Sequence, residues 1–284
     1  MHDTPAGPHP LRVVALTVGE PHAAELWTLH RLTSLGVRLS VVQAEHAFTV
    51  GARKRLMRLV RTQGVIAATS RIVGSRVFAD LVERRASAQL DALFDADHLK
   101  GWWRACGIDR VTVPHLNDPV ARASIADLRP DILVRVSGGI LTREIFELAR
   151  LVTLNIHHGL APEIRGMWSM HWAIIEGRPG WIGATVHRID AGIDTGPIFW
   201  RGSPQIAPGD TATTLFFRAH LQAVDALGRV IAAYASGETP EVWRPRGSVE
   251  SAYRSGPGVI AWLRFLLRGA GRWSTVTFER AVRS

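Results

Sequence analysis

The alternation of β-branched runs with segments of helical periodicity between residues 11 and 200 constrains the fold most strongly. An apolar run over 11–18 ends at Gly19, apolar residues recur at helical spacing over 22–35, and 37–42 is a second apolar run. A strand, helix and strand in this order form a parallel pair with a right-handed crossover. The opening segment therefore predicts a parallel sheet.

The same alternation continues along the chain and predicts further strands and helices. The expected strands lie at 111–113, 132–136, 152–157 and 183–189, and the expected helices at 81–99, 121–128, 143–150, 168–176 and 211–235. Strands that alternate with helices favour an α/β fold with a doubly wound, mostly parallel open sheet. We expect this unit to span residues 11–235, with a helical insertion at about 48–104.

The two ends of the chain differ in composition from this unit. Residues 1–10 are polar and carry three prolines, and we expect a disordered lead-in. Residues 236–284 are rich in Gly, Pro, Arg and Trp, which favours a small C-terminal extension without a core of its own. The single cysteine, Cys106, excludes an internal disulfide framework, and no targeting or membrane-spanning segment is evident. These features favour a cytoplasmic protein.

Charge is distributed unevenly along the sequence. The chain has 34 Lys+Arg against 25 Asp+Glu, a formal net charge of +9, and almost all of the basic residues are arginines. Between Glu45 and Asp80 there are seven basic residues and no acidic one, interleaved with apolar residues. This segment predicts cationic amphipathic helices, which fit either a solvated face or a contact for an anionic substrate or membrane surface.

Asn155 and His157 form a first candidate site. They stand two residues apart on an expected strand, so their side chains share one face near its carboxyl end, where open α/β sheets place their sites. An amide donor beside an imidazole can stabilise an oxyanion and accept a proton, which suits acyl transfer. Taken alone, the two residues fit a capping amide and a core histidine better than a catalytic pair.

A glycine-bracketed loop over 190–197 forms a second candidate site, because it carries Asp190 and Asp194 directly after an expected strand. A rigidly held carboxylate there could orient a histidine or raise its pKa. Aspartates followed by glycines are also common as plain turn residues. The loop alone leaves both interpretations open.

Together the motifs resemble the folate-dependent formyltransferase family. They are Asn155-Ile156-His157-His158-Gly159-Leu160-Ala161-Pro162, Arg165-Gly166, Trp172-Ala173-Ile174, Gly177, Gly183-Ala184-Thr185-Val186-His187 and Ile193-Asp194-Thr195-Gly196. The family includes glycinamide ribonucleotide, methionyl-tRNA and sugar-nucleotide N-formyltransferases and formyltetrahydrofolate deformylase. The resemblance covers residues 105–220 well and 11–45 loosely, and it implies a Rossmann-like formyltransferase fold.

The resemblance also implies roles for individual residues. It makes Asn155, His157 and Asp194 the catalytic residues of a transfer that needs no metal. It implies 10-formyltetrahydrofolate as co-substrate, held largely by main-chain groups of two loops, because a flat ring approaches the backbone only where side chains are absent. The residues expected at that co-substrate are Gly138, Gly139, Ile140, Leu141, Asp190 and Gly192. Those expected at the acceptor are Arg165, Gly166 and Trp168.

Three features depart from the family pattern or need a partner. The loop 158–162 reads His-Gly-Leu-Ala-Pro where the family usually has Pro-Ser-Leu-Leu-Pro. Arg135 stands in a strand that should be buried, so it must pair with another group or lie at the strand end. His158 and His187 are expected to be structural rather than catalytic.

The acceptor stays open at this point. The arginine excess favours a small anionic amine, phosphorylated or nucleotide-linked, such as an amino sugar on a nucleoside diphosphate, and nucleic acid is not favoured. The alternatives are a methionyl-tRNA formyltransferase, whose family members carry an additional β-barrel domain, and a formyltetrahydrofolate deformylase, whose members carry an N-terminal regulatory domain. A folate- or anion-binding module without activity is a further alternative.

The apolar stretch around Trp262, Leu263, Phe265 and Leu266 predicts a dimer contact or a peripheral membrane contact.

Overall fold

The computed structural model describes residues 10–46, 64–74, 80–244 and 251–268, and isolated residues between 57 and 78. The expected disordered lead-in, apart from Pro10, lies outside the described residues. So do much of the basic segment and the last part of the C-terminal extension.

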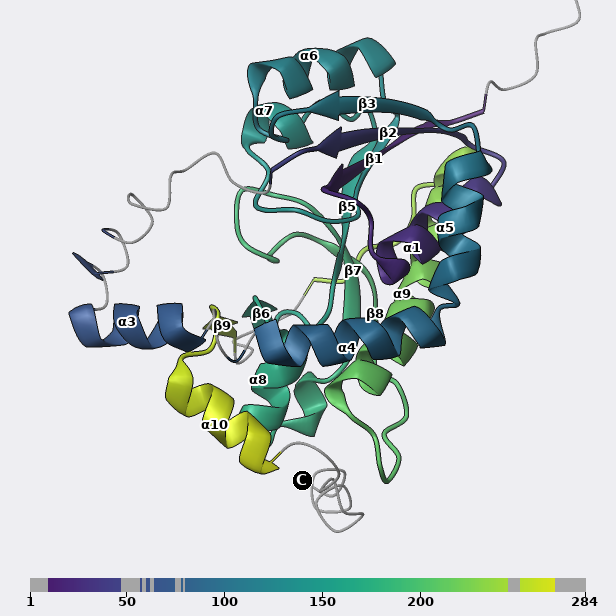
Figure 1. The fold of residues 1–284 in the computed structure, drawn as a ribbon. Helices are drawn as coiled ribbons and strands as arrows, with labels where there is room; N and C mark the ends of the chain where they lie inside the picture. The colour runs from purple at the N-terminus through teal and green to yellow at the C-terminus, as the bar shows by residue number, and fades with distance from the viewer. Residues whose placement is uncertain are drawn as a thin grey trace, which may run out of the picture.

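A seven-stranded sheet forms the centre of the molecule (Figure 1). Its strands are β1 (Arg12–Val18), β2 (Arg38–Ala44), β3 (Asp109–Val113), β4 (Ile132–Arg135), β5 (Val152–His157), β7 (Ala184–Arg188) and β8 (Ile198–Gly202). Their order is β3-β2-β1-β4-β5-β7-β8. The first five are parallel, whereas β7 and β8 run antiparallel to their neighbours. The doubly wound, mostly parallel sheet predicted from the sequence is confirmed.

Helices cover both faces of this sheet (Figure 1). The helices of the described residues are α1 (Ala23–Thr33), α3 (Val65–Val73), α4 (Asp80–Leu93), α5 (Ala96–Ala105), α6 (Pro119–Leu128), α7 (Arg143–Phe146), α8 (Ser169–Glu176), α9 (Ala212–Ala235) and α10 (Val259–Arg268), with a 3-10 turn at Pro179–Trp181. Of these, α3 and α10 lie away from the sheet (Figure 1). The larger apolar core contains residues of α1, α5, α8 and α9, and the smaller one contains residues of α6 and α7. The sheet is thus the middle of three layers.

Strand β1 shows why the sequence forms such a layer. Val13 and Ala15 point into the larger core, whereas Val14 and Leu16 point into the smaller one, and all four are at most 1% exposed. A strand buried on both faces reads as a continuous apolar run rather than an alternating one. Burial of this kind supplies most of the stabilisation of the sheet.

Local sequence explains where several helices begin. Asp118 accepts a hydrogen bond from the Val120 backbone N–H at 2.9 Å, and Pro119 occupies the first helical position of α6. Thr211 and Thr214 form a reciprocal capping pair at the start of α9. The helices predicted at 121–128 and 211–235 are therefore confirmed.

The structure corrects three details of the predicted elements. The helix expected at 81–99 is divided into α4 and α5 at Asp95, whose backbone is left-handed with φ 52°. The helix expected at 143–150 is a single turn, α7, since its chain leaves helical geometry after Phe146. Strand β8 and the short parallel pair of β6 (Ile164–Gly166) and β9 (Ala252–Arg254) were not predicted.

The C-terminal segment packs onto the α/β unit. Strand β9 pairs with β6, and α10 packs against α8. The Trp262 side chain is completely buried and stands edge-on to the Trp168 ring, with 5.0 Å between ring centroids. The expectation that Trp262 belongs to an exposed contact surface is wrong, because this indole fills the interior between α10 and α8.

No helix in the described ranges is both long and apolar enough to span a bilayer.

Candidate active site

The register of three neighbouring strands sets the first row of the site. Arg135 on β4 stands opposite Asn155 on β5, and Asn155 stands opposite His187 on β7. Residues directly opposite in adjacent strands point to the same face and lie within contact distance. Backbone pairing alone therefore brings a guanidinium, an amide and an imidazole side by side.

Hydrogen bonds fix the orientation of the Asn155 amide. Its Oδ1 accepts from Arg135 Nη1 at 2.6 Å, and since a guanidinium can only donate, the amide Nδ2 must face the other way. Nδ2 donates to His187 Nε2 at 3.0 Å, and His187 Nδ1 donates to the Arg188 carbonyl at 2.9 Å. Asn155 is 3% exposed, and within the described part of the chain no group accepts the second Nδ2 hydrogen, which is available to a ligand.

His157 follows two residues later on the same face of β5. Its Nε2 donates to the Ile164 carbonyl at 3.0 Å, so in the neutral ring Nδ1 carries the lone pair. Nδ1 lies 3.4 Å from Asp194 Oδ2. Burial lowers the pKa of His157, although the nearby Asp194 charge opposes this effect. The ring is neutral at physiological pH and can accept a proton at Nδ1.

Asp194 reaches the two histidines from the loop between β7 and β8. Its Oδ2 accepts from the Gly166 backbone N–H at 2.9 Å, and its Oδ1 lies 3.5 Å from His187 Nε2. Burial raises the pKa of this carboxyl, but interactions with His187, His157 and the Gly166 N–H outweigh burial and hold the pKa well below its usual range. The residue is left-handed, with φ 51°, a strained conformation that marks functional loops.

The rest of the loop is built to hold this carboxylate. Asp190 Oδ1 accepts from the Gly192 N–H at 3.0 Å and from the Thr195 hydroxyl at 2.7 Å. A side chain at Gly196 would collide with the Arg188 carbonyl, so only glycine allows the loop to fold back on β7. Asp190 therefore acts within the loop as a turn residue, one of the two interpretations that the sequence left open.

Chemically, the cluster combines a donor for a developing negative charge with a proton acceptor. The second N–H of the Asn155 amide can donate a hydrogen bond to an oxyanion. His157 can accept a proton, and the negative charge of Asp194 then stabilises the protonated imidazole. A negative carboxylate beside a neutral imidazole is the arrangement that stabilises an imidazolium once it forms. These groups suit attack by a nucleophile at a carbonyl carbon.

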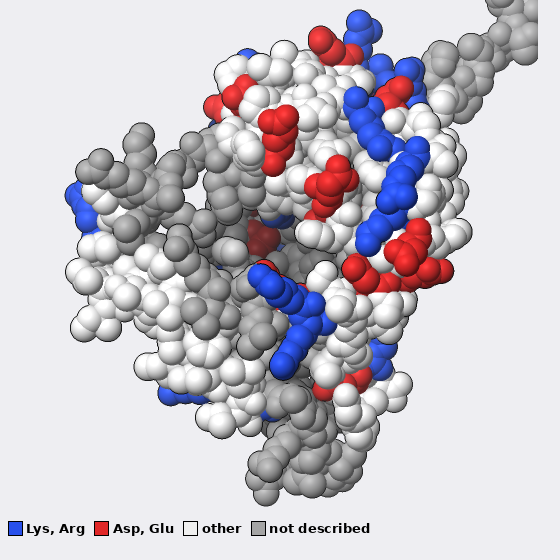
Figure 2. Space-filling model, in the orientation of Figure 1, with Lys and Arg blue, Asp and Glu red and all other residues white. Residues whose placement is uncertain are grey.

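The loop 138–141, expected to meet the co-substrate, lies beside Asn155. Arg135 donates to the carbonyls of Gly138 and Gly139, the latter at 3.0 Å, and so joins this loop to the Asn155 amide. Gly138 has φ 107°, which favours glycine, and the Ile140 side chain is 69% exposed while Leu141 is buried in the smaller core. Gly138 and Gly139, and Gly192 in the Asp194 loop, carry no side chain that would keep a flat heterocycle from the backbone. Figure 2 shows a hollow between the strand ends of the sheet and the β6–β9 region.

The structure places the three residues expected at the acceptor along β6 and the start of α8. Arg165 donates to the Ile193 carbonyl at 3.0 Å and to Ser251 Oγ at 2.9 Å, and Gly166 holds Asp194. Trp168 packs against His171 and Trp262. All three lie within one short segment at the Asp194 loop, and their contact with an acceptor stays a prediction.

Two side chains contact the site more closely than the sequence predicted. Arg135 was expected to need a partner, and it ends β4 and binds Asn155; its direct contact with an expected catalytic residue was missed. His187 was expected to be structural, yet it lies between Asn155 and Asp194. Strand alternation in 184–188 was the available signal, because it sets His187 on the face that Asn155 shares once the strands pair.

His158 lies on the other side of β5. Its Nε2 is 3.0 Å from His220 Nδ1 on α9, and its ring stacks near Phe216 with 4.2 Å between centroids. In the same loop, a side chain at Gly159 would lie 2.7 Å from His157 Nε2. The departure from the family pattern at 158–162 thus coincides with close packing around His157.

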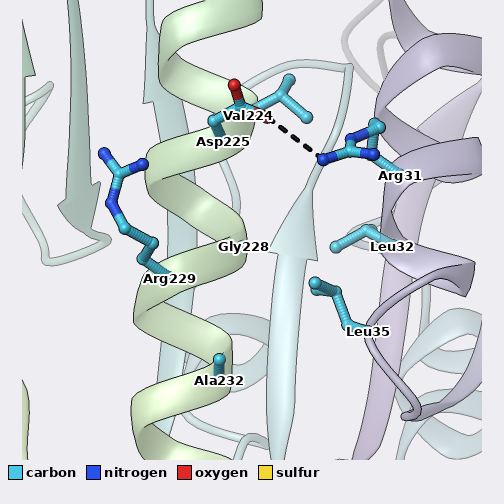
Figure 3. Close-up of a pocket in the computed structure, with 8 residues that line it drawn as sticks. All are labelled: Arg31, Leu32, Leu35, Val224, Asp225, Gly228, Arg229 and Ala232. Atoms are coloured by element: carbon cyan, nitrogen blue, oxygen red, sulfur yellow. Dashed lines mark hydrogen bonds and ion pairs between the residues drawn. The ribbon is translucent and has the colours of Figure 1, made fainter.

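A separate pocket of about 390 Å³ lies between α1 and α9 (Figure 3). An Arg31–Asp225 ion pair of 3.4 Å crosses it. The C-terminal end of α1 leads into the start of β2, so this pocket is at the amino-terminal edge of the sheet, opposite Asn155. Its lining residues are Arg31, Leu32, Leu35, Val224, Asp225, Gly228, Arg229 and Ala232.

Comparison with known proteins identifies the family. The family model described as formyl transferase matches residues 81–231, more than half of the chain. The chain belongs to the formyl transferase family. The match begins in α4 and ends in α9, so it includes Asn155, His157 and Asp194. The family predicted from the motifs is confirmed.

Curated relatives in this family match part of the chain. Methionyl-tRNA formyltransferase of Stutzerimonas stutzeri is 37% identical over 129 residues, 45% of this chain and 41% of that protein. Its counterpart in Anaeromyxobacter dehalogenans is 30% identical over 168 residues, 58% of this chain and 54% of that protein. The chain therefore spans about half the length of the curated relatives that it matches.

Solved structures of the family share the fold over more of the chain. A 4-N formyltransferase from Francisella tularensis aligns over 92% of this chain and 88% of its own, with TM-score 0.52 and 14% identity. Glycinamide ribonucleotide transformylase 1 from Symbiobacterium toebii aligns over 83% and 92%, with TM-score 0.51 and 18% identity. An N-formyltransferase from Helicobacter canadensis, solved with folinic acid and dTDP-3-aminofucose, aligns over 86% and 71%, with TM-score 0.51 and 15% identity. At these identities the likeness establishes the fold alone.

Proposed function

We propose that this chain transfers a formyl group from 10-formyltetrahydrofolate to the amine of a small anionic acceptor. The observation that carries the proposal is the convergence of Asn155, His157 and Asp194 in one nearly buried cluster. Membership of the formyl transferase family supplies the class of chemistry. The loops at 138–141 and 190–192, on either side of that cluster, are the proposed folate contacts.

Each side chain has a defined role in the proposed reaction. The unprotonated amine attacks the formyl carbon, a new C–N bond forms, and the carbonyl oxygen becomes an oxyanion that accepts a hydrogen bond from Asn155 Nδ2. The ammonium proton passes to His157 Nδ1, where Asp194 stabilises the resulting imidazolium. The bond from the formyl carbon to the folate nitrogen then breaks, and that nitrogen takes the proton. Formylated amine and tetrahydrofolate leave, so atoms and charge balance.

An amino sugar linked to a nucleotide is the acceptor that we favour. The N-formyltransferase from Helicobacter canadensis was solved in complex with dTDP-3-aminofucose. The sugar N-formyltransferase from Shewanella aligns with 92% of this chain. Arg165 lies at the Asp194 loop and carries a guanidinium that suits a phosphate or carboxylate. The second candidate is aminoacyl-tRNA, favoured by the identity of 30–37% to methionyl-tRNA formyltransferases.

A formyl-transfer assay tests the proposal. Purified protein is incubated with 10-formyltetrahydrofolate and, in separate arms, a panel of nucleotide-linked amino sugars, initiator methionyl-tRNA, or no amine. We expect an amino sugar heavier by one formyl group, detected by mass spectrometry. Formylated tRNA would replace the acceptor class with the second candidate, and formate release without amine would indicate a deformylase.

Asp194→Asn is the matched inactive variant for this assay. The substitution removes the negative charge that stabilises the protonated His157, so turnover should fall by at least about 100-fold. The folate Kd, measured by fluorescence titration, should change by no more than a few-fold. Wild-type turnover of Asp194→Asn would contradict the proposed mechanism, whatever the acceptor.

A further inference from the structure

Helices α3 and α10 form an apolar surface beside the site. The backbone N–H of Val259, at the start of α10, donates to Ser70 Oγ on α3 at 3.1 Å. Gly74, just after α3, lies so close to Pro257 that a side chain on it would be 2.8 Å from the Pro257 carbonyl. The large exposed apolar side chains of the two helices are Val65, Ile66, Val73, Ile260, Leu263, Leu266 and Leu267, which we call the α3–α10 face.

Helix α10 is apolar on both sides, which is unusual for a surface helix. Trp262 is buried against Trp168 and His171 of the neighbouring segment, and this side attaches the helix to the protein. On the outer side, Ile260 is 68% and Leu267 79% exposed. Large apolar side chains that are this exposed and lie together favour an interaction site. The outer side of α10 therefore fits a second apolar environment.

The positive charge of α3 and α10 favours an anionic partner. Neither α3 nor α10 contains an acidic residue, and their charged residues are Arg71, Arg264 and Arg268. Figure 2 shows no acidic side chain where Figure 1 places the two helices. The sequence from 47 to 79 contains seven basic residues, Arg71 among them, and no acidic one, and 251–278 is also free of acidic residues. The partner of the α3–α10 face must combine apolar contact with negative charge.

A second copy of the chain does not meet that requirement. Two-fold contact sets a surface against itself, so it would bring arginines together with no carboxylate from α3 or α10 to compensate them. A nucleic acid backbone offers charge but leaves Ile66, which is 88% exposed, and Leu267 facing polar phosphates. An anionic bilayer surface offers both, since basic amphipathic helices bury apolar side chains below the headgroups and place arginines among them.

From this combination we propose that the α3–α10 face docks the protein on anionic membrane surfaces. Ile260, Leu263 and Leu267 recur at spacings of three and four residues, with Arg264 beside them, so one side of α10 carries both apolar and basic groups. Contact is peripheral: the α3–α10 face inserts side chains while the sheet stays in water. This inference stands apart from the formyl transfer.

Vesicle cosedimentation of the full chain tests the docking. The vesicles are phosphatidylcholine alone, or phosphatidylcholine with about 30% phosphatidylglycerol, which supplies the surface charge. We expect binding to the mixed vesicles that weakens as salt is raised, and at least tenfold weaker binding to the neutral ones. Equal binding to both, or no binding to the mixed vesicles, would overturn the proposal.

Variants assign the binding to the α3–α10 face. Ile66→Ser combined with Leu267→Ser should weaken binding to mixed vesicles at least tenfold, and Arg264→Glu should weaken it about tenfold. Val120→Ser, which removes an exposed valine from α6 instead, is the control and should bind like the wild type. Melting curves confirm that each variant is folded. Wild-type binding by the double variant overturns the proposal, as does a dimer in analytical ultracentrifugation that these substitutions dissociate.

Discussion

Arg135 shows how one side chain can set the direction of a catalytic amide. An asparagine amide has a donor end and an acceptor end of nearly equal shape, and the hydrogen-bond network decides which end faces a ligand. Arg135 occupies the acceptor end of Asn155 and also binds the carbonyls of Gly138 and Gly139. Burial lowers the pKa of Arg135, the Asp194 charge raises it, and the guanidinium remains charged. We infer that Arg135 is a positioning residue for Asn155.

Replacement of Arg135 is expected to lower turnover more than binding. In Arg135→Leu the amide can rotate, so the oxyanion loses an aligned donor and kcat should fall by about 100-fold. Arg135→Lys keeps one donor and should restore part of that loss. Steady-state kinetics with separate kcat and KM values measure the effect, with Arg188→Leu, an exposed neighbour on β7, as control. An unchanged kcat in Arg135→Leu would remove the positioning role.

The sequence pointed to three residues that the structure brings together, but not to the side chains that contact them. Asn155, His157 and Asp194 follow from ordered motifs whose spacing is visible in one dimension. The contacts of Arg135 and His187 depend on which strands are neighbours and in which register, and the antiparallel direction of β7 in particular is not written in local periodicity. A one-residue shift of β7 would turn His187 away from Asn155.

At the scale of elements, the short β6–β9 pair supports the site from outside the main sheet. Gly166 on β6 donates to Asp194, and its pairing with β9 sets where that N–H points. Gly166 has φ 97°, and a side chain on it would collide with the Arg254 carbonyl. This pair was not predicted, because three-residue strands carry too little pattern to be recognised.

Gly166→Ala should therefore damage activity through the backbone. Separation of β6 from β9 moves the Gly166 N–H away from Asp194, and turnover is expected to fall by about 100-fold. Gly237→Ala is the matched control, since Gly237 also has positive φ, 79°, but has nothing within 4 Å of an added Cβ. The backbone conformation should cost each variant about 1 kcal/mol of stability, measured by urea unfolding. Gly166→Ala should lose more, because its side chain also collides with the Arg254 carbonyl. Equal activity in the two variants would show that β6–β9 pairing does not control Asp194.

At the scale of the whole molecule, buried histidines couple stability to pH. Burial lowers the pKa of His220 to about 4, despite a favourable hydrogen bond to the Ala24 carbonyl, and burial likewise lowers the pKa of His171 to about 4. An unfolded histidine takes up its proton near pH 6.5. Between pH 6.5 and 4 the unfolded chain therefore binds more protons than the folded one, and the free energy of unfolding falls as pH falls.

Each of the two histidines should cost about 3 kcal/mol of stability by pH 4, with no such loss above pH 7. Urea unfolding at pH 7.5, 6 and 4.5 measures this loss. His220→Gln should make the acid loss smaller while lowering stability at pH 7.5, because packing against Phe94 and Thr28 is disturbed. His98→Gln, an exposed position on α5, is the control. An acid loss that is the same in His220→Gln and in the wild type would contradict this origin.

The β6–β9 pair also has a consequence for the order in which the protein matures on the ribosome. Translation delivers every strand of the main sheet before it delivers Ala252–Arg254. A nascent chain that pauses before β9 has the strands that carry Arg135, Asn155 and His187, but Gly166 lacks the pairing partner that aims it at Asp194. The site is thus completed by a segment that is synthesised after the whole main sheet, so the strands of the site can pair before Asp194 is held in place.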